Sequence, residues 1–449
     1  MLFQASPADP YCGATLRPGD AGYDAARRAL AWNQRLPDRF PAAITLANDV
    51  HDVVRAVRTA RAEGLRVTVR SGGHSWAANH VRDGGLVIDV SRLRDLRLDV
   101  RGRLAMAGPG CAGHALDAAL RPHGLFFPAG HCRGVCIGGY LLQGGFGWHG
   151  RTLGLACESV AGLDVVTADG SLVHASEREN ADLYWAARGA GPGFFGVVVR
   201  FHLRLHARPR VIGAAYRSYP ADALPEVFRF LYGVGPHVSP KVELQAMMSR
   251  RVRGVRGPGV EIMAPVFADS LGDARAALEF LDAAPRSRQG VRSPFVPLPL
   301  TWMYREVMRH YPSRHRYAVD NMWMSADVEA VLPHLHALVE ALPPAPSHAL
   351  WLNWAPPQRT TDMAFSLEDA HYLALYGVWE HARDDARYAS WAEDHMRAMA
   401  PLATGIQLAD ENLGHRPAPF VAQAHLDRLD TIRAARDPQQ LFHTWMGRP

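Results

Sequence analysis

The N-terminal half of the chain alternates between short extended and longer helical patterns of hydrophobic residues. Residues 43–61 combine an apolar run, an Asn-Asp pair and three valines at helical spacing, and Gly64 follows them. This order predicts a strand, a helix cap, a helix and a glycine that ends it. Residues 65–69 and 86–90 are rich in branched apolar side chains and predict two strands, separated by a glycine-rich turn at 71–75.

The pattern changes after Leu205. Alternating apolar and polar residues predict further strands, at 242–248, 260–267, 318–325, 349–354 and 372–379. Helical patterns lie between them, at 272–283 and 328–342. Such alternation is typical of an antiparallel sheet. At 449 residues the chain is long enough for two domains, so we expect an α+β protein whose second domain begins near 206–212.

Charge and hydropathy exclude several classes of function. The formal net charge is +5, but Lys and Arg are spread along the chain without a dense basic run, so we expect no nucleic-acid partner. No stretch approaches the roughly 18 uninterrupted apolar residues of a membrane helix, so we expect no membrane partner. Residues 1–7 have neither a basic region nor a long apolar run. No secretory signal is therefore expected, and the cytoplasm is the predicted location.

The cysteines are five in number: Cys12, Cys111, Cys132, Cys136 and Cys157. Their number is odd, no CxxC pair occurs and no histidines cluster around them in the sequence. Neither a disulfide framework nor a metal site is therefore expected. Four of the five fall in the stretch that is richest in glycine, which makes that stretch a candidate site.

Two glycine-rich segments carry the candidate chemistry. The first follows a predicted strand and consists of Arg70, Ser71, Gly72, Gly73, His74 and Ser75. Glycines at a strand end let the backbone approach a ligand, and successive N–H groups in such a turn bind anions such as a diphosphate. For a histidine in a turn, a hydrogen bond to a backbone carbonyl is the common alternative role.

The second segment, residues 128–148, contains seven glycines between Gly130 and Trp148. This density argues against a regular helix or a central strand. Large apolar residues are interleaved with the glycines, whereas disordered glycine-rich linkers are polar. The segment is therefore predicted to form a close-fitting cradle around a large planar ligand.

These two segments resemble the flavin-domain signatures of the vanillyl-alcohol-oxidase superfamily, in particular its berberine-bridge-enzyme-like branch. In that branch, R-G-G-H-S supplies a histidine bonded to the flavin 8α-methyl group, and G-x-C-x-x-V-G-x-G-G supplies a cysteine bonded to flavin C6. His74 matches the histidine and Cys132 matches the cysteine. Further matches lie at 151–156, 165–170, 182–189, 195–198 and 437–442.

The resemblance implies a two-domain PCMH-type FAD-binding fold of the α+β class. Its parts would be a flavin domain at 1–206, an antiparallel-sheet substrate domain at 207–419, and a segment at 420–449 that returns to the flavin domain. FAD would be held by an 8α-histidyl bond and a 6-S-cysteinyl bond, which suit an imidazole and a thiolate as nucleophiles. The residues expected to bind FAD are Arg70, Ser71, Gly72, Gly73, His74, Ser75, Gly130, Cys132, Val135, Gly138, Gly139, Gly144, Gly145, Gly147 and Val198.

Several departures from the family pattern affect the site. Cys136 and Gln143 occupy positions that usually hold glycine, and Phe194 replaces an asparagine. Gln407 stands where the family often has a catalytic tyrosine, so the base must come from elsewhere. The candidate catalytic residues are Tyr376, Gln407, Asn353 and His131. For the candidates on strands, a structural role within the sheet is the common alternative.

The expected activity is that of an FAD-linked oxidase. Flavin N5 would accept hydride from a C–H bond of a small-molecule alcohol, hemiacetal or amine of secondary metabolism, and O2 would reoxidise the flavin. By resemblance, His131 lies beside flavin C4a, where a cation favours reaction with O2. The alternatives are a non-redox cyclase or pericyclic catalyst that contains flavin, and a dehydrogenase with another acceptor. The sequence does not indicate an oligomeric state.

Overall fold

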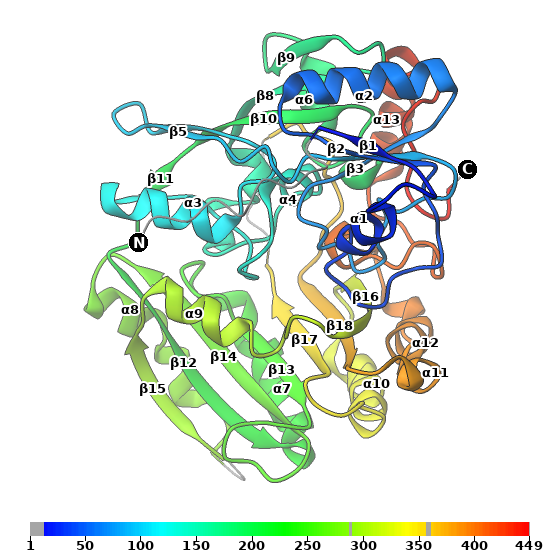
Figure 1. Ribbon diagram of the computed structural model, residues 1–449. Coiled ribbons are helices and arrows are strands. Elements are labelled where there is room, and N and C mark those ends of the chain that lie inside the picture. The colour runs from blue at the N-terminus through cyan, green and yellow to red at the C-terminus, as the bar shows by residue number, and fades with distance from the viewer. Residues whose placement is uncertain (1–12, 287–289, 356–360, 449) are drawn as a thin grey trace.

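The computed structural model describes residues 13–286, 290–355 and 361–448, which form four β-sheets with helices packed against them (Figure 1). Cys12 and residues 1–7 lie outside the described residues. The chain is of the α+β class, as predicted from its hydrophobic pattern.

The first sheet contains the predicted strand-helix-strand unit. Its strands, in spatial order, are β1 (Thr15–Leu16), β2 (Ala43–Leu46), β4 (Leu86–Asp89) and β3 (Val67–Arg70). Both β2 and β3 run parallel to β4. The predicted cap is confirmed, because Asp49 accepts a hydrogen bond from Asp52 N at 2.9 Å and starts α2 (Val50–Glu63). Gly64, at φ 67°, ends the helix.

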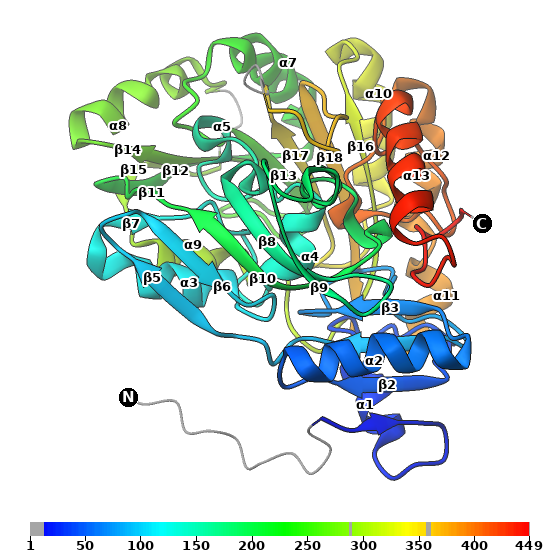
Figure 2. The same cartoon turned by 90° about the horizontal axis from the view of Figure 1, so that it is seen from above.

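The second sheet is antiparallel and lies beside the first, with α2 in contact with both (Figure 2). Its strands, in spatial order, are β5 (Leu96–Asp99), β6 (Leu104–Ala107), β10 (Val197–Arg204), β8 (Val160–Val166) and β9 (Leu172–Ser176). A small pair, β7 (Leu125–Phe126) and β11 (His206–Ala207), lies apart from it. Helix α13 (Gln423–Arg436) packs on α6 (Ala181–Ala186), and the chain beyond it returns to β3, where Val67 N donates to Leu441 O at 2.6 Å.

The third sheet has seven antiparallel strands. In spatial order they are β15 (Arg292–Pro297), β12 (Val211–Pro220), β14 (Gly259–Ala268), β13 (Gln245–Ser249), β17 (His348–Asn353), β18 (His371–Trp379) and β16 (Arg316–Met324). The helices α7 (Leu224–Val234), α10 (Val328–Glu340) and α12 (Trp391–Ala398) share an apolar core with one face of this sheet. The remaining helices near this sheet are α8 (Leu271–Ala277), α9 (Leu300–Val307) and α11 (Asp385–Tyr388).

The glycine-rich segment differs from its prediction at one place. A short helix, α4 (Ile137–Leu142), forms inside it although two glycines lie in its first turn. A Cβ atom at Gly138 would lie 2.6 Å from Ser71 Oγ, so a larger residue would push the helix away from the turn at 71–75. Close packing therefore outweighs the low helix propensity of glycine here.

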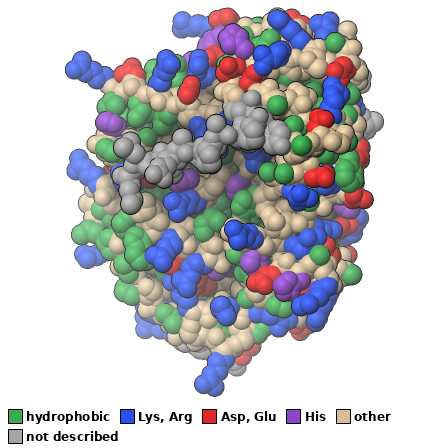
Figure 3. All heavy atoms as spheres, in the orientation of Figure 1, with side chains coloured by type: hydrophobic (Ala, Val, Ile, Leu, Met, Phe, Trp, Pro, Cys, Tyr) green, Lys and Arg blue, Asp and Glu red, His purple; other side chains and the backbone are tan. Residues whose placement is uncertain are grey.

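Charged side chains of both signs are visible on one face of the molecule (Figure 3). On the face shown in Figure 3, Lys and Arg side chains are scattered and interspersed with acidic ones. Within the described ranges, no helix has the length and apolar character needed to span a membrane.

Candidate active site

A pocket lies between the two glycine-rich segments and the face of the seven-stranded sheet that α7, α10 and α12 do not cover. Most of the residues predicted to bind the cofactor line it. They are Arg70, Ser71, Gly72, Gly73, His74, Ser75, Gly130, Cys132, Val135, Gly138, Gly139, Gly145 and Val198. The segments thus meet around one cavity, although they are far apart in the sequence.

Gly144 and Gly147 are not among the residues that line the pocket, so their contact with the ligand stays a prediction. A Cβ atom at Gly147 would lie 2.4 Å from Pro128 O, and Gly144 has a φ of 105°. These two glycines are needed for the path of the loop itself, because a side chain would collide with the backbone or strain it.

The turn at 71–75 is held against its surroundings by side-chain bonds. The Arg70 guanidinium pairs with Asp89 at 3.1 Å and donates to Leu30 O at 3.1 Å. Ser71 Oγ donates to Pro109 O at 2.6 Å. Gly73 has a φ of 70°, and a Cβ atom there would lie 2.3 Å from Leu30 O. The Arg70 side chain therefore fixes the turn, and the turn's backbone faces the pocket.

His74 is a neutral imidazole at physiological pH. Burial lowers its pKa to about 4, outweighing the hydrogen bond to Gly72. Its Nδ1 lies 3.2 Å from Gly72 O, so Nδ1 carries the proton and Nε2 has the free lone pair. The ring stacks on Trp32, with centroids 5.3 Å apart and an interplanar angle of 18°. This arrangement leaves one imidazole nitrogen as a nucleophile.

Cys132 presents a protonated thiol. Burial raises its pKa to about 12, and the negative charge of Asp410 adds to the shift. Cys136, four residues later, donates from Sγ to Gly110 O at 3.3 Å. The four cysteines in the described part of the chain are all free.

A buried carboxylate that no sequence motif predicts lies in the wall of the pocket. Asp410 Oδ2 accepts hydrogen bonds from Tyr372 Oη at 2.5 Å and from Tyr376 Oη at 2.9 Å. Its Oδ1 accepts one from Trp76 Nε1 at 2.6 Å. Burial raises the pKa of Asp410, although these three donors oppose the shift. The site therefore holds a phenol-carboxylate pair able to take up a proton.

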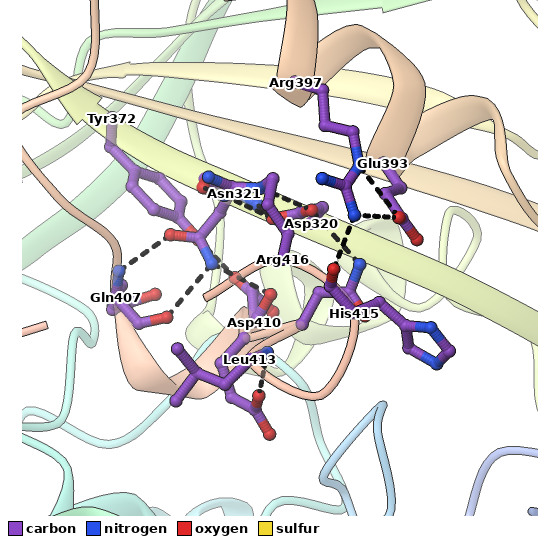
Figure 4. Close-up of polar contacts among 12 residues, drawn as sticks. Asp320, Asn321, Tyr372, Glu393, Arg397, Gln407, Asp410, Leu413, His415 and Arg416 are labelled. Carbon is purple, nitrogen blue, oxygen red and sulfur yellow. Dashed lines mark hydrogen bonds and ion pairs between the residues drawn. The ribbon is translucent and has the colours of Figure 1, made fainter. Parts of the chain in front are cut away.

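The loop that carries Asp410 is fastened to β16 (Figure 4). Asn321 accepts from Gln407 N at 2.7 Å, and its Nδ2 donates to Gln407 O at 3.0 Å and to Asp410 O at 2.8 Å. Further along the loop, the Arg416 guanidinium binds both oxygens of Asp320, at 2.5 and 2.8 Å. These buried bonds hold the position of Asp410 relative to the sheet.

The predicted catalytic residues fall into two groups. Tyr376, Gln407 and His131 line the pocket. Asn353 does not, and its Nδ2 donates to Gly235 O at 3.0 Å on the side of the sheet that α7 covers. The prediction for Asn353 is wrong because the pocket side of β17 carries Leu350 and Leu352, and side chains alternate along a strand.

His131 is fixed by a second buried carboxylate. Its Nε2 lies 2.9 Å from Glu243 Oε2, while Glu243 Oε1 accepts from His149 N at 2.6 Å. The His131 ring also packs on Trp148, with centroids 4.2 Å apart. Glu243 therefore connects the start of the large sheet to the segment that carries Cys132.

The part of the pocket wall formed by the large sheet and α9 is mainly apolar. Its apolar members include Met247, Met263, Met303, Val307, Leu350 and Leu352, and its polar members are Tyr216, Gln245, Glu306, Tyr372 and Tyr376. Methionine side chains adapt to irregular ligands, and branched aliphatic side chains offer no hydrogen bonds. An ionic pair, Arg253 to Glu306 at 2.7 Å, lies at the same end of the pocket.

The residues of the pocket fit FAD. The backbones of the 71–75 turn and of Gly130, Gly138, Gly139 and Gly145 line the cavity, where a planar ring and its phosphates can approach them. At Gly139 a Cβ atom would meet nothing within 4 Å. A neutral imidazole and a thiol face the same cavity, as attachment at two positions requires. His443 also lines the cavity, and its Nε2 is buried without a hydrogen-bond partner.

Comparisons with known proteins agree with this geometry. The family model of the FAD binding domain matches residues 41–176. The FAD-linked oxidoreductase nodO of Hypoxylon pulicicidum is 32% identical over 94% of this chain and 94% of its own. Among solved structures, 6-hydroxy-D-nicotine oxidase of Arthrobacter nicotinovorans superposes with a TM-score of 0.85 at 23% identity, covering 96% of both chains. The BBE-like 1 protein of Physcomitrella patens gives 0.82 at 20% identity, over 96% of this chain and 95% of its own.

Proposed function

This chain belongs to the FAD-linked oxidoreductases and has the PCMH-type, berberine-bridge-enzyme-like fold. From that premise we propose that it is an oxidase with FAD attached at His74 and Cys132. Its substrate is a bulky, largely apolar alcohol or amine, its electron acceptor is O2, and it acts in the cytoplasm. The observation that carries the proposal is the Tyr376–Asp410 pair in the wall of the pocket.

The proton path follows from that pair. Bound FAD would supply the hydride acceptor for a C–H bond next to a hydroxyl or amino group. Tyr376 Oη lies 2.9 Å from Asp410 Oδ2, so the phenol can receive the substrate's proton while it passes its own to the carboxylate. Burial raises the pKa of Asp410, which favours the protonated carboxyl that this step produces. Substrate thus loses one hydride and one proton, and Asp410 ends protonated.

The apolar wall supports the choice of substrate. Three methionines and three aliphatic residues on that side would gain free energy from covering hydrocarbon surface. A sugar would instead present hydroxyls that these side chains cannot pair, and each unpaired buried polar group costs on the order of 1–3 kcal/mol. Tyr216, Arg253 and Glu306 at the same end offer a polar contact for one end of the ligand.

The test is anaerobic reduction of the bound flavin, followed by stopped-flow absorbance with a panel of apolar alcohols and amines. Tyr376→Phe removes the proton acceptor, and we expect flavin reduction to slow by about 10²-fold or more. Asp410→Asn should cause a loss of similar size. Tyr372→Phe is the matched control, because it removes a donor to Asp410 but leaves the Tyr376–Asp410 bond.

Two outcomes would contradict the proposal. Equal reduction rates in Tyr376→Phe and wild type would mean that the proton leaves by another route. A flavin that no substrate of the panel bleaches, in a protein that still transforms one of them, would indicate non-redox catalysis.

A further inference from the structure

A second group of polar side chains lies away from the pocket, on the second sheet. Asp164 of β8 is directly opposite His174 of β9, and His202 of β10 lies on the same face. One ligand atom from each, two imidazole nitrogens and a carboxylate oxygen, lie within 4.8 Å of one another. The three side chains are half-buried, and none of them lines the pocket.

The two imidazoles converge on a single oxygen. His174 Nδ1 lies 2.9 Å and His202 Nε2 lies 3.1 Å from Asp164 Oδ1. We propose that Asp164, His174 and His202 form a binding site for a divalent transition-metal ion, with Zn²⁺ as the representative ion. Two histidine nitrogens with one carboxylate oxygen are a donor set that such ions prefer. Metal–ligand bonds of about 2.0–2.2 Å in a tetrahedron place ligand atoms roughly 3.4 Å apart, so binding needs only small side-chain movements.

The surroundings of Asp164 suit this role. Arg200 Nη1 lies 3.2 Å from Oδ2, so it orients the carboxylate through one oxygen and leaves Oδ1 to the ion. The positive charge of Arg200 also opposes a cation, which limits the affinity.

The backbone makes room for the ligands. A Cβ atom at Gly162 would lie 3.0 Å from His174 Cε1, so glycine lets this imidazole lie across β8. The three protein ligands leave the fourth position of a tetrahedral ion to water, as in catalytic zinc sites. Because the ligands come from three adjacent strands, the ion would link β8, β9 and β10.

Binding is tested on the tag-free flavin-loaded protein after treatment with a chelator. Equilibrium dialysis against Zn²⁺, with metal analysis by mass spectrometry, should show one saturable site per chain. His174→Ala and His202→Ala should each weaken binding by at least about tenfold, and the double variant should lose the site. His51→Ala, an exposed histidine on α2, is the matched control and should bind as wild type does.

Two independent readouts complete the test. Co²⁺ bound to the wild type should give visible absorption bands of nitrogen and oxygen ligation, which needs no variant. The ion should also raise the thermal midpoint of the wild type but not of Asp164→Asn. Absence of saturable binding, or equal binding in the double variant, would overturn the proposal and leave the three residues as a hydrogen-bonded network only.

Discussion

His74 and Cys132 face the same cavity but differ in how ready they are to react. The imidazole is neutral, because burial lowers its pKa to about 4, and its Nε2 lone pair needs no proton removed. The thiol has a pKa raised to about 12 by burial and by Asp410, so only a small fraction is thiolate at neutral pH. The two proposed bonds to FAD should therefore form with different dependence on pH.

We expect apo-protein reconstituted with FAD to form the His74 bond at a rate that changes little across the neutral range. Formation of the Cys132 bond should accelerate as pH rises, by up to about tenfold per pH unit, because the thiolate fraction rises in that proportion below the thiol's pKa. Mass spectrometry of flavin-bearing peptides at timed intervals measures both.

Variants separate the two bonds. His74→Ala and Cys132→Ala should each retain covalent flavin, and the double variant should release FAD on acid precipitation. Free FAD from the denatured wild type, or an adduct on Cys136 instead of Cys132, would contradict the assignment.

At the same scale, the sequence revealed the cofactor side of the site better than the catalytic side. The motif around His74 is local, so spacing alone identifies it. Asp410 reaches the site through contacts with Trp76, which lies 334 positions away, and with two tyrosines of β18. No pattern in the sequence reports such a distance. A weak signal existed in the Gln407 position, since the loss of a phenol there required another group to take up the proton.

At the scale of elements, Glu243, which lies just before β13, positions His131, the residue next to Cys132 in the chain. Glu243 is buried and is shared between His131 Nε2 and His149 N. A carboxylate oxygen at 2.9 Å from Nε2 orients the imidazole. If His131 assists the reaction with O2, Glu243 acts through it as a positioning residue.

The prediction is that His131→Leu and Glu243→Gln both slow reoxidation of the reduced flavin, by about tenfold, because the first removes and the second releases a polar group held in place near the reacting centre. Their effects should not add in the double variant, because they act through one contact. Stopped-flow mixing of reduced protein with O2 measures the rate. Additive effects would separate the two residues, and reoxidation that is unchanged in both would argue for an acceptor other than O2.

The loop after Asp410 carries another buried acid. Glu411 accepts hydrogen bonds from Asn79 Nδ2 and from Leu413 N, the latter at 2.7 Å. Burial raises its pKa to about 7. Because the folded-state pKa is above the unfolded value of about 4.3, its contribution to stability is fully present below that unfolded value. The contribution is lost as the pH rises through about 7.

We therefore expect the free energy of unfolding to fall by about 3 kcal/mol from this group between about pH 4 and pH 8. Glu411→Gln removes the ionisation and should flatten that part of the profile, at the cost of one hydrogen bond at every pH. Urea unfolding of both proteins across this range is the measurement. Parallel profiles for the two would show that Glu411 keeps an ordinary pKa.

At the scale of the whole molecule, the hydrophobic pattern predicted five strands of the large sheet and missed β12 and β15. It could not give their spatial order, which places β13 between β14 and β17. It also missed α4, where packing of Gly138 on Ser71 decides the structure. Around Gln407 the chain forms one bridge at Gly405 and then a short 3-10 turn that ends at Asp410, which the hydrophobic pattern did not predict.

The contact between the glycine-rich segments and the large sheet involves the whole molecule, and the side chain of Arg151 makes several of its hydrogen bonds. Arg151 lies on α5 (Gly150–Leu153), and its buried guanidinium donates to Val242 O at 2.8 Å and to Trp354 O at 3.0 Å. It also donates to the carbonyls of Val238 and Ser239, both at 3.2 Å. One side chain therefore satisfies four carbonyls that come before β13 and after β17.

Arg151→Met keeps the length of the side chain but leaves these carbonyls without their donor. We expect a loss of about 3 kcal/mol or more in the free energy of unfolding, since each buried unpaired polar group costs on the order of 1–3 kcal/mol and water will reach some of them. The unfolding transitions followed by flavin fluorescence and by tryptophan fluorescence should both move to lower urea concentration, because Arg151 connects the glycine-rich segments to the large sheet. Arg229→Met, which breaks only an exposed pair with Glu329, should change little. Separate flavin and tryptophan transitions already in the wild type would show that the two parts unfold independently, and that Arg151 serves only its own loop.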